Sequence, residues 1–351
     1  MTDNFKRPAD NYSPLYFMAS LGAGGLSVSF FMLLYFWVPH KGQVVPIFED
    51  LAAAFGKGDI KMQALIVFCM VVIAVLAFIQ FKYLIWNLKQ FSRFKKTQAY
   101  EELKNSNAET TLLAMPLTLA MAINVCFVLG LVYVPKLWTV VEYMFPLAMI
   151  AFGWVGLIAL RYIGDFLGRV LSQGGVFDVM AHNSFAQLLP AFALSMVGVG
   201  FVAPAAMSTN IATVTVSMIG STFFGVAAMI YAIVAVITAF NSMLHYGTHK
   251  ETGPTLLMVI PIMTLLAILF LRQDHGLHAT FSAHAEAVDG MVMMSRYIAI
   301  QVVFLLLGLL VLNRQGYFKD FVFGPKTSPG SYALICPGVA LSVLLHFFRK
   351  V

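Results

Sequence analysis

Charged residues are scarce in this chain, and their scarcity excludes a soluble enzyme. Of its 351 residues, 11% are Asp, Glu, Lys or Arg, whereas a soluble domain carries about 25%. Apolar residues make up 60%, and the mean hydropathy is +0.83. Because so little charge cannot cover a water-exposed surface, most of the surface must face lipid. The net charge of +6 is spread over the loops, which indicates membrane orientation rather than nucleic-acid binding.

Cysteine is also scarce and forms no recognised motif. Cys69, Cys126 and Cys336 lie in separate apolar stretches, with neither a CxxC pair nor a Cys/His metal spacing. We therefore expect buried structural thiols, no metal and no cofactor. The first thirteen residues are polar and contain no apolar run, so we expect no cleaved signal peptide.

Apolar segments long enough to cross a bilayer dominate the rest of the sequence. No long polar block separates them, which predicts a single transmembrane domain over residues 1–351. The nine predicted spans are 14–38, 63–88, 112–134, 138–160, 184–207, 210–240, 253–271, 292–313 and 331–348.

The distribution of Lys and Arg between alternate loops predicts the orientation. Thirteen lie at the N-terminus and after spans two, four, six and eight, against six in the opposite loops. Because cytoplasmic loops carry the excess of Lys and Arg, we expect a cytoplasmic N-terminus. Arg349 and Lys350 depart from this pattern.

A proline-centred string recurs in every second span. Its four copies begin Met115-Pro116-Leu117, Leu189-Pro190-Ala191, Ile260-Pro261-Ile262 and Cys336-Pro337-Gly338. The prolines stand 74, 71 and 76 residues apart, and each interval holds two spans. Span one has a glycine-rich string at the comparable place, Leu21-Gly22-Ala23-Gly24-Gly25-Leu26. The repeating unit is therefore a helical hairpin.

Proline removes a backbone hydrogen bond and clashes with the preceding turn, so the strings predict a kink at one depth in each odd-numbered span. Carbonyl groups freed within a bilayer must face protein or a water-filled lumen. We therefore expect an all-α membrane protein in which odd spans form an inner ring and even spans an outer ring around a central path.

The predicted inner spans contain no Asp, Glu, Lys or Arg within their cores. Proton pumps and ion-coupled transporters place such groups at membrane depth, so their lack argues against proton coupling and cation selectivity. A weakly polar pore suits poorly hydrated anions. The candidate pore-lining polar residues are Ser20, Thr118, Asn124, Ser195 and Thr264.

Three histidines, His275, His278 and His284, follow span seven together with acidic residues. Their spacing matches no standard zinc site, so we expect a solvated external loop here.

One distinctive string is Gln173-Gly174-Gly175-Val176-Phe177, which is followed by His182, Ser184-Phe185 and Leu189-Pro190-Ala191. Shorter strings are spread in order along nearly the whole chain: Tyr16-Phe17, Leu21-Gly22, Phe223-Phe224-Gly225 and His275-Gly276. Together these strings resemble the tellurite-resistance/dicarboxylate transporters, the family that includes bacterial TehA and the plant slow anion channels (SLAC), and the first string is the most specific. The resemblance implies ten helices as five hairpins around a pseudo-fivefold pore, a homotrimer, and a small-anion pore closed by a phenylalanine on span nine.

The chain departs from the family pattern in three places. Cys336 matches the gate phenylalanine, Ser20 stands where TehA has proline, and the ninth span has no hairpin partner before Val351. At Cys336 and Pro337 the gate must then be more open, or else Phe17 and Phe192 fill it. A cysteine at such a position would also fit a divergent branch of membrane (seleno)proteins called TsoY, which the chain resembles more faintly.

The functional prediction is a membrane channel or transporter for small anions, not an enzyme, with the bilayer and a small anion as its partners. Two alternatives stay open: a secondary exporter of a small organic acid or oxyanion, and a redox-active membrane protein using Cys336.

Overall fold

The computed structural model describes residues 12–173, 177, 178, 180, 184–281 and 287–350, and these contain helices but no strand. Nine helices in these ranges are long and apolar enough to cross a membrane, as predicted. They are Pro14–Trp37, Ile60–Phe94, Asn107–Tyr133, Leu137–Gln173, Phe185–Met207, Ile211–Tyr246, Lys250–Leu277, Gly290–Arg314 and Pro329–Arg349. The chain is therefore an all-α, multi-pass membrane protein.

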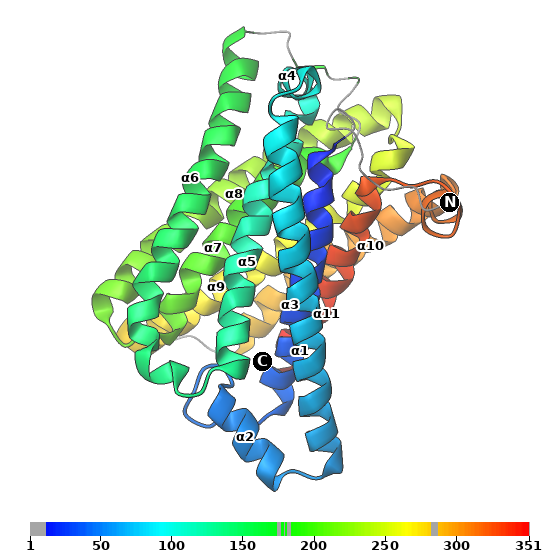
Figure 1. The fold of residues 1–351 in the computed structure, drawn as a ribbon. Helices are drawn as coiled ribbons and strands as arrows, with labels where there is room; N and C mark the ends of the chain where they lie inside the picture. The colour runs from blue at the N-terminus through cyan, green and yellow to red at the C-terminus, as the bar shows by residue number, and fades with distance from the viewer. Residues whose placement is uncertain (1–11, 174–176, 179, 181–183, 282–286, 351) are drawn as a thin grey trace.

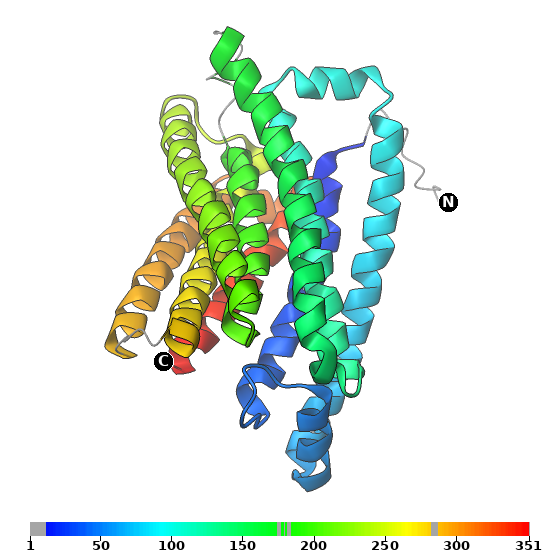
Figure 2. The same cartoon turned by 90° about the vertical axis from the view of Figure 1, so that its left-hand side faces the viewer.

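The α-helical parts of these spans alternate between two sets. The odd spans contain α1 (Phe17–Trp37), α5 (Ala114–Tyr133), α7 (Leu189–Met207), α9 (Val259–Phe281) and α11 (Ile335–Lys350). The even spans contain α3 (Ile60–Phe94), α6 (Val141–Gln173), α8 (Ile211–Tyr246) and α10 (Ala287–Arg314). Two short helices, α2 (Phe48–Lys57) and α4 (Gln98–Lys104), lie at opposite ends of the molecule (Figures 1 and 2).

Several helices extend beyond their apolar segments. The sequence predicts an end near residue 160 for the fourth span and 271 for the seventh, but α6 reaches Gln173 and α9 reaches Phe281. The expected loop at His275 is therefore wrong, because that residue lies within α9 with its side chain exposed. Backbone hydrogen bonding does not require apolar side chains, so a helix can continue into water where polar residues protrude.

Each odd span begins with a 3₁₀ segment and then becomes α-helical. The segments are η2 (Pro14–Tyr16), η3 (Asn107–Leu113), η5 (Phe185–Leu188), η6 (Lys250–Met258) and η8 (Pro329–Leu334). Each contacts its neighbours in that order, and η8 also contacts η2. These segments share one end of the molecule with α4, and we call it the 3₁₀ end.

Serine hydroxyls begin four of the five segments. Ser13, Ser106, Ser184 and Ser328 each accept a hydrogen bond at Oγ from the backbone N–H two residues further on. A side chain of this kind satisfies a donor that the helix itself leaves without a partner.

The repeated prolines mark the junction between the two helix types. Pro190 is the second residue of α7, and Pro116, Pro261 and Pro337 are the third residues of their α-helices. Proline is tolerated in a first turn, where a backbone N–H is least needed and its fixed φ suits the helix. The 70- to 80-residue periodicity of the sequence therefore corresponds to the start of α-helix in each odd span.

The odd spans are more buried than the even ones. Their most apolar stretches are 67, 67, 89 and 83% buried in spans one, three, five and seven, against 28, 39, 33 and 17% in the even spans. Span nine is the exception at 39%. Along the chain, each odd α-helix contacts the next one, and α11 contacts α1.

Candidate functional site

Two adjoining cavities lie among the odd helices. The smaller, of about 90 Å³, is lined only by residues of α1, α5, α7, α9 and α11, with Leu21, Met121, Phe192, Pro261 and Cys336 among them. It lies toward the 3₁₀ end, since most of its lining residues belong to the first two turns of their helices.

The larger cavity, of about 180 Å³, continues toward the other end of the same helices. It adds residues near their C-termini, such as Leu131, Met207 and Phe347. Part of its wall comes from α6, through Phe145 and Phe152, and from Trp138 before that helix. The two cavities together follow the odd helices over much of their length.

The walls of both cavities are almost entirely apolar. In the part of the chain that the structure describes, Arg272 of α9 is the one charged side chain that lines either cavity, and it lies at the larger. The sequence predicts that the span ends at residue 271, but α9 continues to Phe281 and therefore includes Arg272. Among the described residues, no carboxylate forms an ion pair with its guanidinium.

Asn124 and Thr264 place an amide and a hydroxyl on the cavity walls. Asn124 lines the larger and donates from Nδ2 to the sulfur of Met196 at 3.5 Å. Thr264 lines the smaller, and its hydroxyl donates to the Ala340 carbonyl at 3.0 Å. The Thr264 hydroxyl also accepts from Nε2 of Gln301 at 2.6 Å, which joins α9 to α10 and α11. The Thr264 hydroxyl therefore joins three helices. The Asn124 amide, by contrast, donates to a thioether sulfur, which is a weak hydrogen-bond acceptor.

About half of the predicted site residues line these cavities. Gly22, Gly25, Phe192, Pro261, Thr264 and Cys336 line the smaller cavity, and Asn124 lines the larger. Phe17, Ser20, Gly24, Pro116, Thr118, Pro190, Ser195 and Pro337 line neither.

The predicted hydroxyl residues that do not line a cavity, Ser20, Thr118 and Ser195, donate to backbone carbonyls. Ser20 donates to the carbonyl of Gln80 on α3 at 2.8 Å, and Ser195 to that of Phe192 at 2.9 Å. Thr118 donates to the Ala114 carbonyl at 2.7 Å. The Ser20 bond joins two helices, as small hydroxyl residues of membrane helices commonly do, whereas these bonds of Ser195 and Thr118 return to the preceding turn of their own helix.

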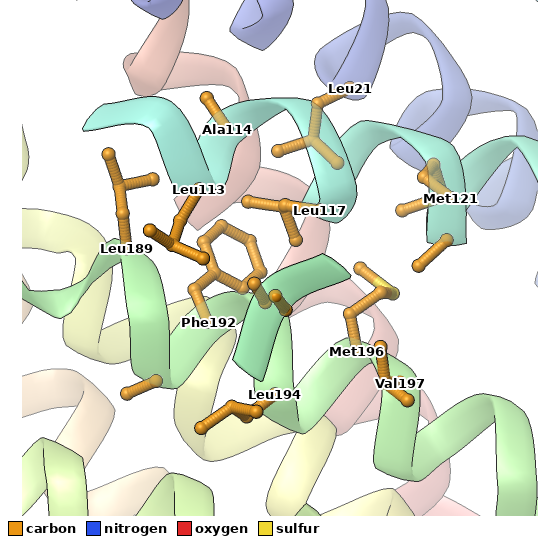
Figure 3. Packing of buried hydrophobic residues seen from close by; sticks show 14 of the residues in the cluster. Leu21, Leu113, Ala114, Leu117, Met121, Leu189, Phe192, Leu194, Met196 and Val197 are labelled. Carbon is orange, nitrogen blue, oxygen red and sulfur yellow. The ribbon is translucent and has the colours of Figure 1, made fainter. Parts of the chain in front are cut away.

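Phe17 and Gly24 also face other helices. The Phe17 ring packs edge-on against Phe91 of α3, with centroids 5.9 Å apart, and is fully buried. A Cβ at Gly24 would lie 2.6 Å from Oε1 of Gln80 and 2.7 Å from Met121, so this glycine allows α1 to approach α3 closely. Phe192 packs beside Leu113 and Leu117 of the third span (Figure 3).

Arg272 and Met196 are not among the residues that the sequence predicts for the site. Arg272 lies one residue beyond the predicted span 253–271, so the hydropathy pattern places it in a loop. Its spacing from Leu265 and Ile268, at i+7 and i+4, places the three side chains on one face of a helix. That spacing is the signal that could have identified it.

Comparisons of the chain with models of protein families and with curated proteins, and of the structure with solved structures, found no match. The string Gly174–Val176 and His182, which carry much of the resemblance noted above, lie outside the described residues. Within the described residues, no group of three His, Cys, Asp or Glu side chains could hold a metal ion. The function is therefore inferred from the chemistry of the cavities.

Proposed function

We propose that this protein conducts small anions across a membrane along a path that joins the two cavities. The observation that carries this proposal is Arg272: the one charged side chain on the cavity walls is a cation without a described carboxylate partner. An anion that entered the larger cavity would supply the missing negative charge.

The arrangement proposed around this path is an inner ring of odd helices enclosed by even ones, with pseudo-fivefold symmetry. It is supported by the contacts that run from α1 through α5, α7 and α9 to α11 and back to α1. The lining of the smaller cavity by all five odd helices also supports it. This arrangement agrees with the resemblance to the anion channels of the TehA and SLAC type, from which we also propose a homotrimer in a bacterial inner membrane.

Electrostatics favours anions over cations in such a path. A unit charge about 4 Å from another is attracted or repelled by about 4 kcal/mol at an effective dielectric constant of 20. Arg272 would therefore attract an anion and repel a cation at the same place. No Asp or Glu within the described ranges lines either cavity to reverse that preference.

The test is ion flux through the purified protein in planar bilayers and proteoliposomes containing chloride or nitrate. We expect anion currents whose reversal potential follows the anion gradient. Substitution of Arg272 by Gln should lower the anion-to-cation permeability ratio by about tenfold or more, since 1.4 kcal/mol is a factor of ten.

The matched control is Arg296→Gln on α10, because Arg296 is exposed and lines neither of the two cavities. It should leave the permeability ratio unchanged. Cation-selective current, or equal effects of the two substitutions, would contradict the proposal. Uptake that requires a second ion gradient would instead indicate a secondary exporter of an organic acid or oxyanion.

A further inference from the structure

The two cavities meet at a set of six shared residues. Val28, Met121, Met196, Leu265, Ile268 and Val343 line both cavities, and all five odd helices contribute at least one of them. Since each of the six faces both cavities, the set stands between them. We call it the shared ring.

We infer that the shared ring is an apolar gate in which Met121 and Met196 are the moving side chains. This inference rests on the proposed anion path. A ring of apolar side chains at a narrow point excludes water, and an anion cannot cross it without losing its hydration. The six side chains contain no group that could replace that hydration.

The place of this ring differs from the gate expected from the sequence. Cys336 and Phe192 line only the smaller cavity, so each lies to one side of the shared ring. Phe17 lines neither cavity. The bulk that replaces a gate phenylalanine is thus supplied by side chains of all five odd helices, at a different depth.

The two methionines differ from the other four members in their freedom to move. Val28, Leu265, Ile268 and Val343 are branched, whereas methionine is unbranched and has three rotatable bonds. Figure 3 shows Met121 on α5 and Met196 on α7, two neighbouring helices that contact each other. Rotation of these two side chains can therefore widen the ring without a shift of the backbone.

Met196 also accepts a hydrogen bond from the side-chain amide of Asn124, which could otherwise donate to an anion. Its sulfur accepts the hydrogen bond from Nδ2 of Asn124, which lies three residues after Met121 on α5. A thioether is a weak acceptor and an anion a much stronger one. When Met196 turns away, the Asn124 amide is released to donate to the passing anion, so opening also adds a polar contact at the gate.

The experiment compares anion conductance of Met121→Ala, Met196→Ala and the double variant with that of the wild-type protein. Each single variant should conduct more, and the double variant should exceed the wild type by about tenfold or more, because shortening both side chains lets water fill the ring. Met121→Leu and Met196→Leu retain a bulky apolar side chain and should stay near the wild-type conductance.

The matched control is Met115→Ala, because Met115 is a buried methionine of α5 that lines neither cavity. It should not raise the conductance. Folding of each variant is checked by gel filtration and thermal unfolding in detergent. Met196→Gln, which hydrates the ring without shortening the side chain, gives the same test if the double alanine variant does not fold.

A further pair of variants tests the role of Asn124. Asn124→Leu introduced into Met196→Ala should lower anion conductance below that of Met196→Ala alone, whereas the conductance of the wild type should change little. Equal losses in both backgrounds would contradict a role confined to the open state.

The outcomes separate the gate from the path. If the Met variants conduct like the wild type while Arg272→Gln still lowers anion selectivity, the gate is wrong and the anion path remains. If no variant carries anion current, Met121→Ala/Met196→Ala included, the proposed function itself is wrong.

Discussion

Among single residues, Cys336 is the thiol placed to report on the cavities. It lines the smaller cavity, whereas Cys69 and Cys126 line neither. In a Cys69→Ala/Cys126→Ala background, small thiol reagents that reach Cys336 should reduce anion flux, because the added group occupies part of a cavity of about 90 Å³. Flux is measured in proteoliposomes before and after treatment.

The control for this prediction is Cys336→Ala in the same background, whose flux should not respond to the reagent. Cys336→Phe should reduce flux without any reagent, since the ring would fill the smaller cavity. A reagent that labels Cys336 but leaves flux unchanged would place the thiol outside the path.

Glu109 provides a second prediction at the same scale. Its carboxylate is almost fully buried in η3 and pairs with the guanidinium of Arg169 on α6, which ties the 3₁₀ end to an even helix. Arg169→Ala leaves a buried unpaired charge and should lower the free energy of unfolding by about 3–5 kcal/mol. Thermal unfolding in detergent measures the loss.

Replacing both partners should cost much less than replacing one. Glu109→Leu/Arg169→Leu removes the buried charge together with its partner, so most of the loss should be recovered. A matched control is Lys326→Ala, which breaks an exposed ion pair to Asp320 and should have little effect. A double variant as unstable as Arg169→Ala would show that the pair itself, and not the unpaired charge, decides stability.

Among the elements, the close packing of α6 against α7 and α8 depends on glycine. A Cβ at Gly156 would lie 2.4 Å from the Phe224 ring of α8 and 3.2 Å from Val197 of α7. Small residues at such places let membrane helices approach each other. Gly156→Ala should therefore destabilise the protein by about 1–3 kcal/mol through overpacking.

The same helix provides the control. Gly164 lies two turns further along α6, and a Cβ there would meet no atom within 4 Å. Gly164→Ala should be neutral or stabilising by up to about 1 kcal/mol, because alanine is the better helix former. Thermal unfolding of both variants in one detergent compares them, and equal destabilisation would contradict a packing role for Gly156.

The sequence predicts the number of spans well and their ends poorly. Nine apolar segments suffice to identify nine spans, because a bilayer fixes the length of apolar chain needed. The ends of α6 and α9 extend into polar sequence, where hydropathy no longer reports helix. The short helix α2 lacks a long apolar run, and its position is supported by contacts with α3 and α5 that no local pattern encodes.

For the whole molecule, the hairpin repeat predicts that the odd spans are the more buried ones, which holds for all but span nine, but it does not predict which side chains line a cavity. Helices α1, α5 and α7 are apolar on every side, so periodicity does not distinguish a cavity face from a packing face. Polarity alone therefore marks Ser20 and Thr118 as candidates, yet in the structure they donate to backbone carbonyls. Met121 and Met196 give no signal in the sequence, since an apolar residue among apolar residues looks like core.

The charge bias predicts that the 3₁₀ end of the molecule faces the cytoplasm. The loop with Lys95 and Lys96 joins α3 to α4 and so lies at this end, where the charge bias predicts the cytoplasm. In a background without native cysteines, Lys96→Cys should resist an impermeant thiol reagent added outside intact cells and react once the membrane is opened.

Lys41→Cys is the matched control, because Lys41 is also exposed but lies between α1 and α2 at the opposite end. It should react from outside. The reverse pattern would invert the topology, and Arg272, which lies nearer the α2 end, would then attract anions from the cytoplasm instead of from outside.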